Sequence, residues 1–429
     1  MFTLVLFTGL ILLLTFGFPV AVAVGLPSAL ALYFSGLGVG SIANSIYTGI
    51  AKYPMLAVPM FVLAGILFER SGAVGRILKL VSVVTNRFPN SLGIFVIGLT
   101  MMIGGVTGST NAGAAAVMVM VLTAMTRNGY PKPLTAAIVG SAATTEILIP
   151  PSLTLIMYSI FVPEVTVPAL FAAGMVPGII MGIGIMVPTY FLAVWYRDQQ
   201  PVDAKPVKHP PIGKVLLDAG WGLMAPVLIL GGMRLGWFTP TEAAVVAAAY
   251  CAFLGLVVFR EMNLRDFVDA AISASETTAV IMIIVAMATT FSWAGSTLGV
   301  FDPIVNGILS VGIPWLILAL VLLLLLVAGT LLDGTTIILV IVPILLPVAR
   351  SLDWNLVWFG IIVTVCVGIG QVTPPVGMNL MITSRLANVP FNSTFTYVKW
   401  LLIGMLIAAL IMVLEPETVL WLPRYFEYI

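Results

Sequence analysis

Long apolar runs follow one another along almost the whole chain, and charged residues stand mainly in the short segments between them. The runs lie at about 1–17, 19–36, 54–69, 91–126, 133–162, 169–196, 214–233, 240–259, 277–294, 314–349, 354–384 and 397–414. A helix needs about 20 predominantly apolar residues to cross the hydrocarbon core of a membrane, and each run reaches or approaches that length. The pattern predicts an all-α polytopic membrane protein.

Two of the runs are too long for one ordinary crossing, and small and polar residues interrupt each of them. The run 91–126 contains GGVTGSTNAG at 104–113, and the run 314–349 contains AGTLLDGTT at 328–336. Irregular backbone at membrane depth is tolerated only where protein, water or a ligand satisfies its polar groups. Each run is therefore predicted to form a re-entrant helical hairpin with a polar tip, and the second half-helix of the first hairpin is expected to start after Asn111.

Two other runs carry adjacent prolines near their middle, in EILIPPSLT at 146–154 and QVTPPVGMNL at 371–380. Proline lacks a backbone N–H and disfavours helical geometry in the residue before it, so a Pro-Pro pair opens a helix. The second break is predicted to free the carbonyls of Gln371, Val372 and Thr373, which suit a hard cation such as sodium. Broken helices at corresponding places in two repeats predict a transport site between them.

The second half of the chain repeats features of the first at an offset of 222 residues. This shift carries Asn111 onto Asp333 and Pro168 onto Pro390, and a hydrophilic stretch at 197–213 separates the halves. Repetition at a fixed offset indicates an internal duplication.

The duplication predicts two repeats joined by a cytoplasmic linker. The expected boundaries are 1–196 for the first repeat, 197–213 for the linker and 214–429 for the second repeat. Scaffold helices, a hairpin with a broken helix, and a closing helix are expected at 1–90, 91–162 and 169–196, and again at 214–294, 314–386 and 397–414.

Positive charges orient the repeats, because lysine and arginine accumulate on the cytoplasmic side of membrane proteins. The cytoplasmic markers are Arg70, Arg76, Lys79, Arg87, Arg127, Lys132, Arg197, Lys205, Lys208, Lys214, Arg260, Arg265 and Arg385, with Arg350 and Arg424 as exceptions. Their distribution predicts that the first hairpin enters from the cytoplasm and the second from outside, so that the repeats are inverted and both termini lie outside. Segments 41–53 and 264–275 are predicted to be amphipathic helices along the membrane interface.

Composition excludes several classes of function. The chain is 61% hydrophobic and 8% charged, with a net charge of +1, so a nucleic-acid partner is excluded. Its two cysteines, Cys251 and Cys366, lie in apolar runs, and its single histidine, His209, lies in the linker. These residues exclude a disulfide framework and a Cys/His metal centre, and they offer no reactive set for a membrane enzyme. No Walker motif indicates an ATP-driven pump.

Two acidic residues fall at membrane depth. Asp333 lies at the second hairpin tip, and Glu146 lies four residues before the first Pro-Pro pair. An intramembrane carboxylate costs about 2.5 kcal/mol or more and usually marks an ion or proton path. For Glu146, a structural carboxylate bonded to the freed backbone is an equal alternative. Glu242 and Glu276 are expected at helix starts, where they favour the helix dipole.

Six segments carry a resemblance to a known family. They are AVPMFVLAG at 57–65, GSTNAGAAAV at 108–117, EILIPPS at 146–152, VPGIIMG at 176–182, FTPTEAAV at 238–245 and QVTPPVGMNL at 371–380. In this order and at this chain length, the sequence resembles the large membrane subunit of the tripartite ATP-independent periplasmic (TRAP) transporters.

The resemblance implies a secondary transporter of the bacterial inner membrane that works as an elevator, with a scaffold and a mobile transport domain. Two or more sodium ions would drive the import of an organic anion such as a sialic acid or a C4-dicarboxylate, and no organic cofactor is expected. A periplasmic solute-binding protein would deliver the solute, and a small four-helix membrane subunit would complete the complex in the lipid bilayer. The alternatives are a channel or an independent sodium/dicarboxylate carrier without a binding protein.

The resemblance also implies where the ligands bind. One sodium ion would lie among Gly108, Ser109, Asn111, Ile149 and Pro151, and a second among Gly329, Asp333, Thr373 and Val376. The substrate carboxylate would lie near Thr110, Ser152, Thr336 and Asn379.

Overall fold

The structure is a computed structural model that describes residues 2–85, 91–107, 110–197 and 212–429. Within these ranges the chain forms helices joined by short turns and contains no β-strand. Seven of the described helical spans are long and apolar enough to cross a membrane, or eight if the bent pair α16 and α17 counts as one. They are Tyr53–Arg70, Val167–Tyr196, Val215–Arg234, Pro240–Val258, Leu264–Thr297, Pro314–Leu331 and Phe391–Leu414. The all-α class is confirmed, and the chain is a multi-pass membrane protein.

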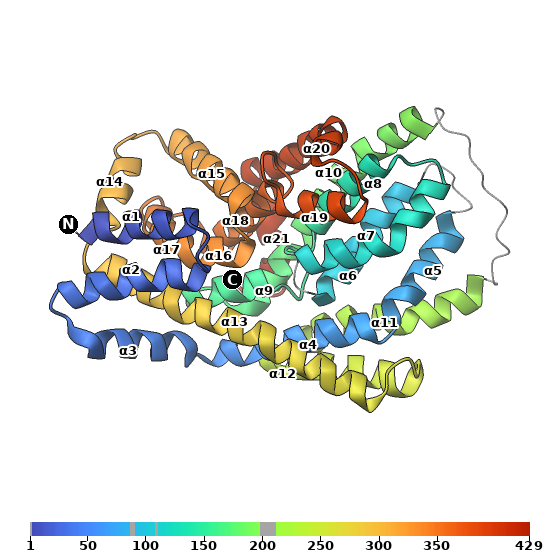
Figure 1. Ribbon diagram of the computed structural model, residues 1–429, viewed down its shortest axis with the longest axis horizontal. Helices are drawn as coiled ribbons and strands as arrows, with labels where there is room; N and C mark the ends of the chain where they lie inside the picture. Colours follow the sequence, from blue (N-terminus) through green and yellow to red (C-terminus); the bar gives the residue numbers. More distant parts are fainter. Residues whose placement is uncertain (1, 86–90, 108–109, 198–211) are drawn as a thin grey trace.

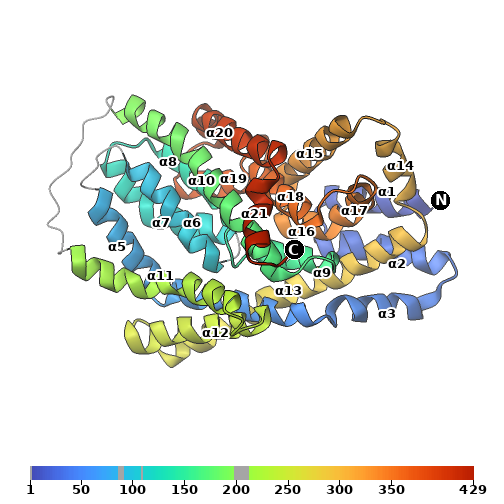
Figure 2. The same ribbon diagram turned by 180° about the vertical axis from the view of Figure 1, so that it is seen from behind.

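The helices follow in the order shown in Figures 1 and 2. The first half holds α1 (Phe2–Thr15), α2 (Val20–Phe34), α3 (Gly38–Ile50), η1 (Tyr53–Leu56), α4 (Ala57–Arg70), α5 (Ala73–Thr85), α6 (Leu92–Thr107), α7 (Thr110–Arg127), α8 (Lys132–Ala143), α9 (Leu153–Phe161) and α10 (Val167–Arg197). The second half holds α11 (Ile212–Arg234), α12 (Pro240–Phe253), η2 (Leu254–Val258), α13 (Leu264–Thr297), α14 (Asp302–Leu309), α15 (Pro314–Leu331), α16 (Gly334–Val340), α17 (Val342–Ser351), α18 (Leu356–Gly370), α19 (Met378–Leu386), η3 (Phe391–Thr394), α20 (Phe395–Leu414) and α21 (Glu417–Tyr425).

One group of helices forms a long layer along one side of the molecule. In both views α3, α4, α12 and α13 run along this side, while the hairpins and the broken helices gather on the other. Helix α13 packs on α2, α3 and α4, and α4 packs on α12. Small residues allow this close approach: a β-carbon on Gly49 would lie 2.5 Å from the Thr289 hydroxyl, and one on Gly25 would lie 2.4 Å from the Met287 sulfur.

Helix α13 corrects one expectation from the sequence. Segment 264–275 was predicted to be an interface helix separate from the apolar run 277–294, but one helix covers both. The hydroxyls of Ser273, Ser275 and Thr277 each donate to the carbonyl four residues earlier, so the polar residues stay within the helical pattern instead of ending it. The helix itself begins with a capping box formed by Asn263 and Asp266.

The two acids predicted at helix starts differ in outcome. Glu242 does lie in the first turn of α12, where it forms a capping box with Thr239, so its structural role is confirmed. Glu276 lies in the middle of α13 and is exposed, so its expected place at a helix start is wrong. The interface segment predicted at 41–53 corresponds to the separate helix α3.

Two helical hairpins are present at the expected runs. Helices α6 and α7 form the first, and its tip residues Gly108 and Ser109 lie outside the described part of the chain. Helix α7 begins at Thr110, earlier than the start expected after Asn111. Helices α15 and α16 form the second hairpin and turn at Leu332 and Asp333.

The second hairpin contains a bend that the sequence did not lead us to expect. Helix α16 ends after seven residues, and α17 continues from it at an angle of 59°. Pro343 lies in the first turn of α17 and has no N–H to donate to the preceding turn, which explains why one straight helix does not form.

Helices α10 and α20, which close the two halves, touch through glycine. A β-carbon on Gly404 would lie 1.9 Å from the carbonyl oxygen of Gly184, and one on Gly184 would lie 2.7 Å from the carbonyl oxygen of Gly404. Only residues without a side chain allow backbones to meet this closely, as in other membrane helix pairs. The closing helices therefore pack as a tight pair.

Candidate functional site

Both Pro-Pro pairs open their helices, as predicted. Helix α8 ends at Ala143 and α9 begins at Leu153, while α18 ends at Gly370 and α19 begins at Met378. The Pro150–Pro151 and Pro374–Pro375 bonds are both cis. Each break lies between two short helices of one run, so its polar groups are available at depth within the protein.

The two breaks lie side by side, although more than 200 residues separate them in the chain. The Thr383 hydroxyl of α19 donates to the carbonyl of Ala136 in α8 at 2.9 Å. A β-carbon on Gly368 of α18 would lie 3.2 Å from the carbonyl oxygen of Thr144 in the first break. The Tyr158 hydroxyl of α9 donates to the carbonyl of Leu356 at 2.7 Å. The broken helices of the two halves thus pack on each other along their length.

Each hairpin packs against both broken helices. The first hairpin contacts α8 through α6 and α7, and α7 also contacts α19. The second hairpin contacts α18 through α15 and α16, and α16 also contacts α9. The helices of both hairpins and both broken helices therefore pack together within the described part of the chain.

A buried hydrogen-bond cluster joins the first hairpin to the second break. The Thr110 hydroxyl donates to Oε1 of Gln371 at 2.8 Å, and the Asn379 amide donates to the same oxygen at 3.2 Å. All three side chains are buried, and the backbone N–H of Asn379 also donates to the carbonyl of Gln371. Two predicted substrate residues, Thr110 and Asn379, are therefore brought together by Gln371, whose side chain was not predicted as part of the site.

The remaining predicted substrate residues have local partners. The Ser152 hydroxyl caps α9: it donates to the carbonyl of Ile147 at 2.6 Å and accepts from the N–H of Leu155. The Thr336 hydroxyl donates to the Asp333 carboxylate. The structure therefore gives both residues a local bonding role, in addition to any contact with a solute.

Asp333 begins α16 as its N-cap. Its Oδ2 accepts from the backbone N–H of Thr335 at 3.1 Å and of Thr336 at 3.4 Å. A carboxylate is favoured there because the helix dipole places positive partial charge at this end. Next to it, a β-carbon on Gly334 would lie 3.4 Å from the Thr154 hydroxyl of α9, so the second tip lies against the half-helix that follows the first break.

Close backbone packing brings Gly329, one member of the second sodium set, to the second break. A β-carbon on Gly370 would lie 2.5 Å from the α-carbon of Gly329, so α15 and α18 touch at this point. Thr373 donates its hydroxyl to the carbonyl of Ile369 at 2.7 Å, which holds this side chain on the end of α18. Gly377 has φ +55°, and a β-carbon there would lie 3.2 Å from the carbonyl oxygen of Thr373. Val376, next to Gly377, is half-buried.

The first sodium set is only partly described. Gly108 and Ser109 lie outside the described residues, whereas Asn111, Ile149 and Pro151 are described. Oδ1 of Asn111 is buried and has no hydrogen-bond partner in the described ranges. A buried oxygen acceptor without a donor fits a hard cation, since sodium takes oxygen ligands from side chains and freed carbonyls. Oδ1 of Asn379 has the same property among the described residues.

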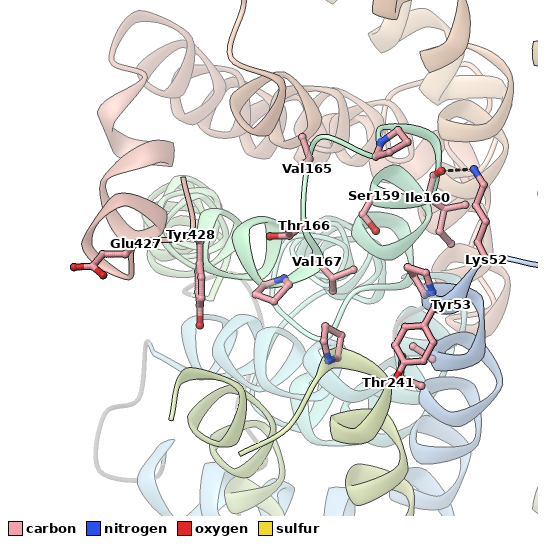
Figure 3. Close-up of a pocket in the computed structure, with 15 residues that line it drawn as sticks. Lys52, Tyr53, Ser159, Ile160, Val165, Thr166, Val167, Thr241, Glu427 and Tyr428 are labelled. Atoms are coloured by element: carbon pink, nitrogen blue, oxygen red, sulfur yellow. Dashed lines mark hydrogen bonds between the residues drawn. The ribbon is translucent and has the colours of Figure 1, made fainter. Parts of the chain in front are cut away.

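Two cavities border this region. One of about 530 Å³ reaches Ile149 and Pro150 of the first break and separates them from α11, where Pro226 lines it. Another of about 830 Å³ lies at the opposite end of α9, as Figure 3 shows. There the Lys52 ammonium donates to the carbonyl of Ile160 at 2.7 Å, and burial lowers the pKa of Lys52.

Known proteins match this chain along most of its length. The family model of the DctM component of the tripartite ATP-independent periplasmic transporter matches residues 7–418. The C4-dicarboxylate TRAP transporter large permease protein DctM of Pseudomonas aeruginosa is 35% identical, over 94% of this chain and 94% of its own. The sialic acid TRAP transporter large permease protein SiaM of Vibrio cholerae is 31% identical, over 94% of this chain and 96% of its own.

A solved structure matches the fold. The YdaH transporter of Alcanivorax borkumensis has a TM-score of 0.59 and covers 88% of this chain and 89% of its own. The sequence identity is 14%, so this likeness concerns the fold alone.

Proposed function

The chain belongs to the DctM family of TRAP transporter large permeases, and on this premise we propose that it is the membrane-embedded subunit of a sodium-coupled importer of organic anions. The observation that carries the proposal is the packing of both hairpins on both broken helices, together with the buried bond from Thr110, at the start of α7, to Gln371 of the second break. Broken helices that expose backbone groups at depth are the usual binding sites of secondary transporters.

Sodium is the proposed coupling ion because of the oxygens that this region offers. The second tip carries the Asp333 carboxylate, and the first carries the buried Oδ1 of Asn111. The breaks add carbonyls, including that of Thr373. The negative charge of Asp333 is important, because a cation at membrane depth is costly unless a carboxylate or several oxygens bind it.

We further propose that the two halves are inverted repeats and that the molecule works as an elevator. The spacing of the elements supports the duplication: α6 begins at Leu92 and α15 at Pro314, which repeats the offset of 222 residues. Elevator movement requires a static and a mobile body. The long layer of α3, α4, α12 and α13 is the proposed scaffold, and the hairpins with the broken helices are the proposed transport domain.

The proposed solutes are C4-dicarboxylates, sialic acids or related carboxylates, as named for the relatives from Pseudomonas aeruginosa and Vibrio cholerae. Donors that could bind a carboxylate include the hydroxyl of Thr110 and the amide of Asn379, once the solute competes for them with Gln371. The proposed partners are a small four-helix membrane subunit and a periplasmic solute-binding protein, in a bacterial inner membrane with both termini of this chain outside.

Uptake into proteoliposomes tests the proposal. The chain is reconstituted alone, with a candidate small membrane subunit, and with that subunit and a candidate solute-binding protein. Radiolabelled succinate and N-acetylneuraminate are then offered with an inward gradient of sodium or of choline. Accumulation that requires all three proteins and sodium is expected. Uptake by this chain alone would favour the independent carrier, and equal uptake in choline would contradict sodium coupling.

A further inference from the structure

We propose that Glu146 is the charge partner of the first sodium site, supplying from the first proline break the negative charge that Asp333 supplies at the second hairpin tip. The inference rests on the proposed sodium coupling. It concerns a residue that lies outside both predicted sodium sets, and it gives a function to the most deeply buried acid among the described residues.

Glu146 lies fully buried in the segment between α8 and α9, three residues before Ile149. A carboxylate at membrane depth is costly, and such residues usually face an ion or proton path. The backbone of Glu146 is well satisfied, because its N–H donates to the carbonyl of Ala143 at 3.1 Å.

Two glycines of the first hairpin form a cradle around this side chain. A β-carbon on Gly113 of α7 would lie 2.0 Å and 2.2 Å from the two carboxylate oxygens of Glu146. A β-carbon on Gly104 of α6 would lie 2.1 Å from its Cγ and 2.7 Å from its Cα. The Glu146 carboxylate therefore fills the space that a side chain at position 113 would occupy, in the first turn of α7.

This arrangement gives each half of the chain one carboxylate at its hairpin tip. In the second half, Asp333 supplies it from the tip itself, as the N-cap of α16. The position that matches Asp333 in the first half is Asn111, which is uncharged. The position that matches Glu146 in the second half, at the offset of 224 that relates the two Pro-Pro pairs, is Gly370. In the first half the acid thus lies in the broken helix, and in the second half it lies in the hairpin. In both halves it stands at the N-terminal end of the second helix of the hairpin, α7 or α16.

The electrostatics of the site explain why an acid is needed there. Helix α7 begins at this place, and its N-terminal end carries positive partial charge that repels a cation. The Glu146 carboxylate lies on the first turn of α7 and reverses the local sign. The buried Oδ1 of Asn111, two residues before Gly113, then provides an oxygen for the ion.

The experiment measures sodium binding to the full-length chain in detergent, without transport. The thermal unfolding midpoint is followed as NaCl replaces choline chloride at constant ionic strength. Four proteins are compared: the wild type, Glu146→Gln, the double variant Glu146→Gly with Gly113→Asp, and the control Glu276→Gln. The double variant returns a carboxylate to the cradle from the opposite helix, and the control removes an exposed acid of α13.

We expect Glu146→Gln to raise the sodium concentration for half-maximal stabilisation by roughly tenfold or more, since a fixed charge near the ion is lost. The double variant should return it to near the wild-type value, and Glu276→Gln should not change it. A purely structural Glu146 would lower the midpoint at every salt concentration without shifting the sodium dependence, and that result would overturn the proposal.

Two further outcomes are decisive. If Glu146→Gln does not fold, the double variant decides: recovery of both folding and the sodium response supports the proposal, and recovery of folding alone overturns it. If the wild type itself gains no stability from sodium over choline, the proposed sodium coupling fails and this inference fails with it. A sodium response in the wild type that Glu146→Gln retains defeats the inference alone.

Discussion

Replacing Gln371 with leucine tests whether the first hairpin tip is fastened to the second proline break. The change nearly keeps the side-chain volume but removes Oε1, which accepts from Thr110 at 2.8 Å and from Asn379 at 3.2 Å. Both donors are buried, so both lose their partner away from bulk water. Each buried group left unsatisfied costs about 1–3 kcal/mol, so Gln371→Leu should destabilise the protein by about 2–6 kcal/mol.

A double-mutant cycle with Thr110→Val isolates the bond between the two elements. Thr110→Val alone should cost about 1 kcal/mol, because Oε1 of Gln371 keeps its bond from Asn379. Thr110→Val combined with Gln371→Leu should cost about 1–2 kcal/mol less than the sum of the single effects, because the unpaired hydroxyl is then absent. Unfolding by SDS in mixed micelles, followed by tryptophan fluorescence, measures these differences.

A matched control and a refuting result complete the test. Among the described residues, the Thr126 hydroxyl donates to carbonyls of its own helix α7, so Thr126→Val should be additive with Gln371→Leu. A coupling energy below about 0.5 kcal/mol between positions 110 and 371 is what independent sites show. That result would refute the proposed bond between the first hairpin and the second break.

Three further predictions concern the second tip, the second break and the end of α9. Asp333→Asn should preserve folding, since asparagine caps helices as well as aspartate, but should weaken sodium-dependent uptake; wild-type sodium dependence would contradict the role of the charge. Gly377→Ala should lower the thermal midpoint, because φ +55° costs an alanine about 1–2 kcal/mol, whereas Gly307→Ala, with open space around it, should not. Burial lowers the pKa of Lys52 below its ordinary 10.5, so the unfolded chain binds more protons than the folded one between the folded-state pKa and 10.5. The thermal midpoint of the wild type should therefore rise with pH in that interval, and Lys52→Met should abolish this rise.

The sequence was sufficient to predict the elements whose signals are local. Proline pairs and clusters of small polar residues within apolar runs act on their own backbone, so the breaks and the hairpins were predicted at the right places. The motifs likewise identified the family, which the comparisons confirm over residues 7–418. The division into repeats and the roles of the sodium and substrate residues stay predictions.

The errors and omissions concern contacts that depend on distant partners. The continuity of α13 was missed because Ser275 and Glu276 look like a helix boundary, whereas packing on α2, α3 and α4 keeps the helix intact. The side chain of Gln371 was missed because its partner Thr110 lies 261 residues away. Its position at the start of the QVTPPVG segment was the one available signal, and the sequence did not show which donor it would meet.

The unbroken helix α13 sets a length that the surrounding membrane must match. Its charged and exposed beginning, with Arg265, Asp269 and Glu276, belongs in water or among lipid headgroups. The apolar remainder, from Thr277 to Thr297, extends about 31 Å at 1.5 Å per residue. This matches the roughly 30 Å hydrocarbon thickness of an ordinary bilayer, so the apolar part of α13 is long enough to span it. Because this apolar length is fixed by one unbroken helix, lipids with much shorter or longer chains should create a hydrophobic mismatch at α13.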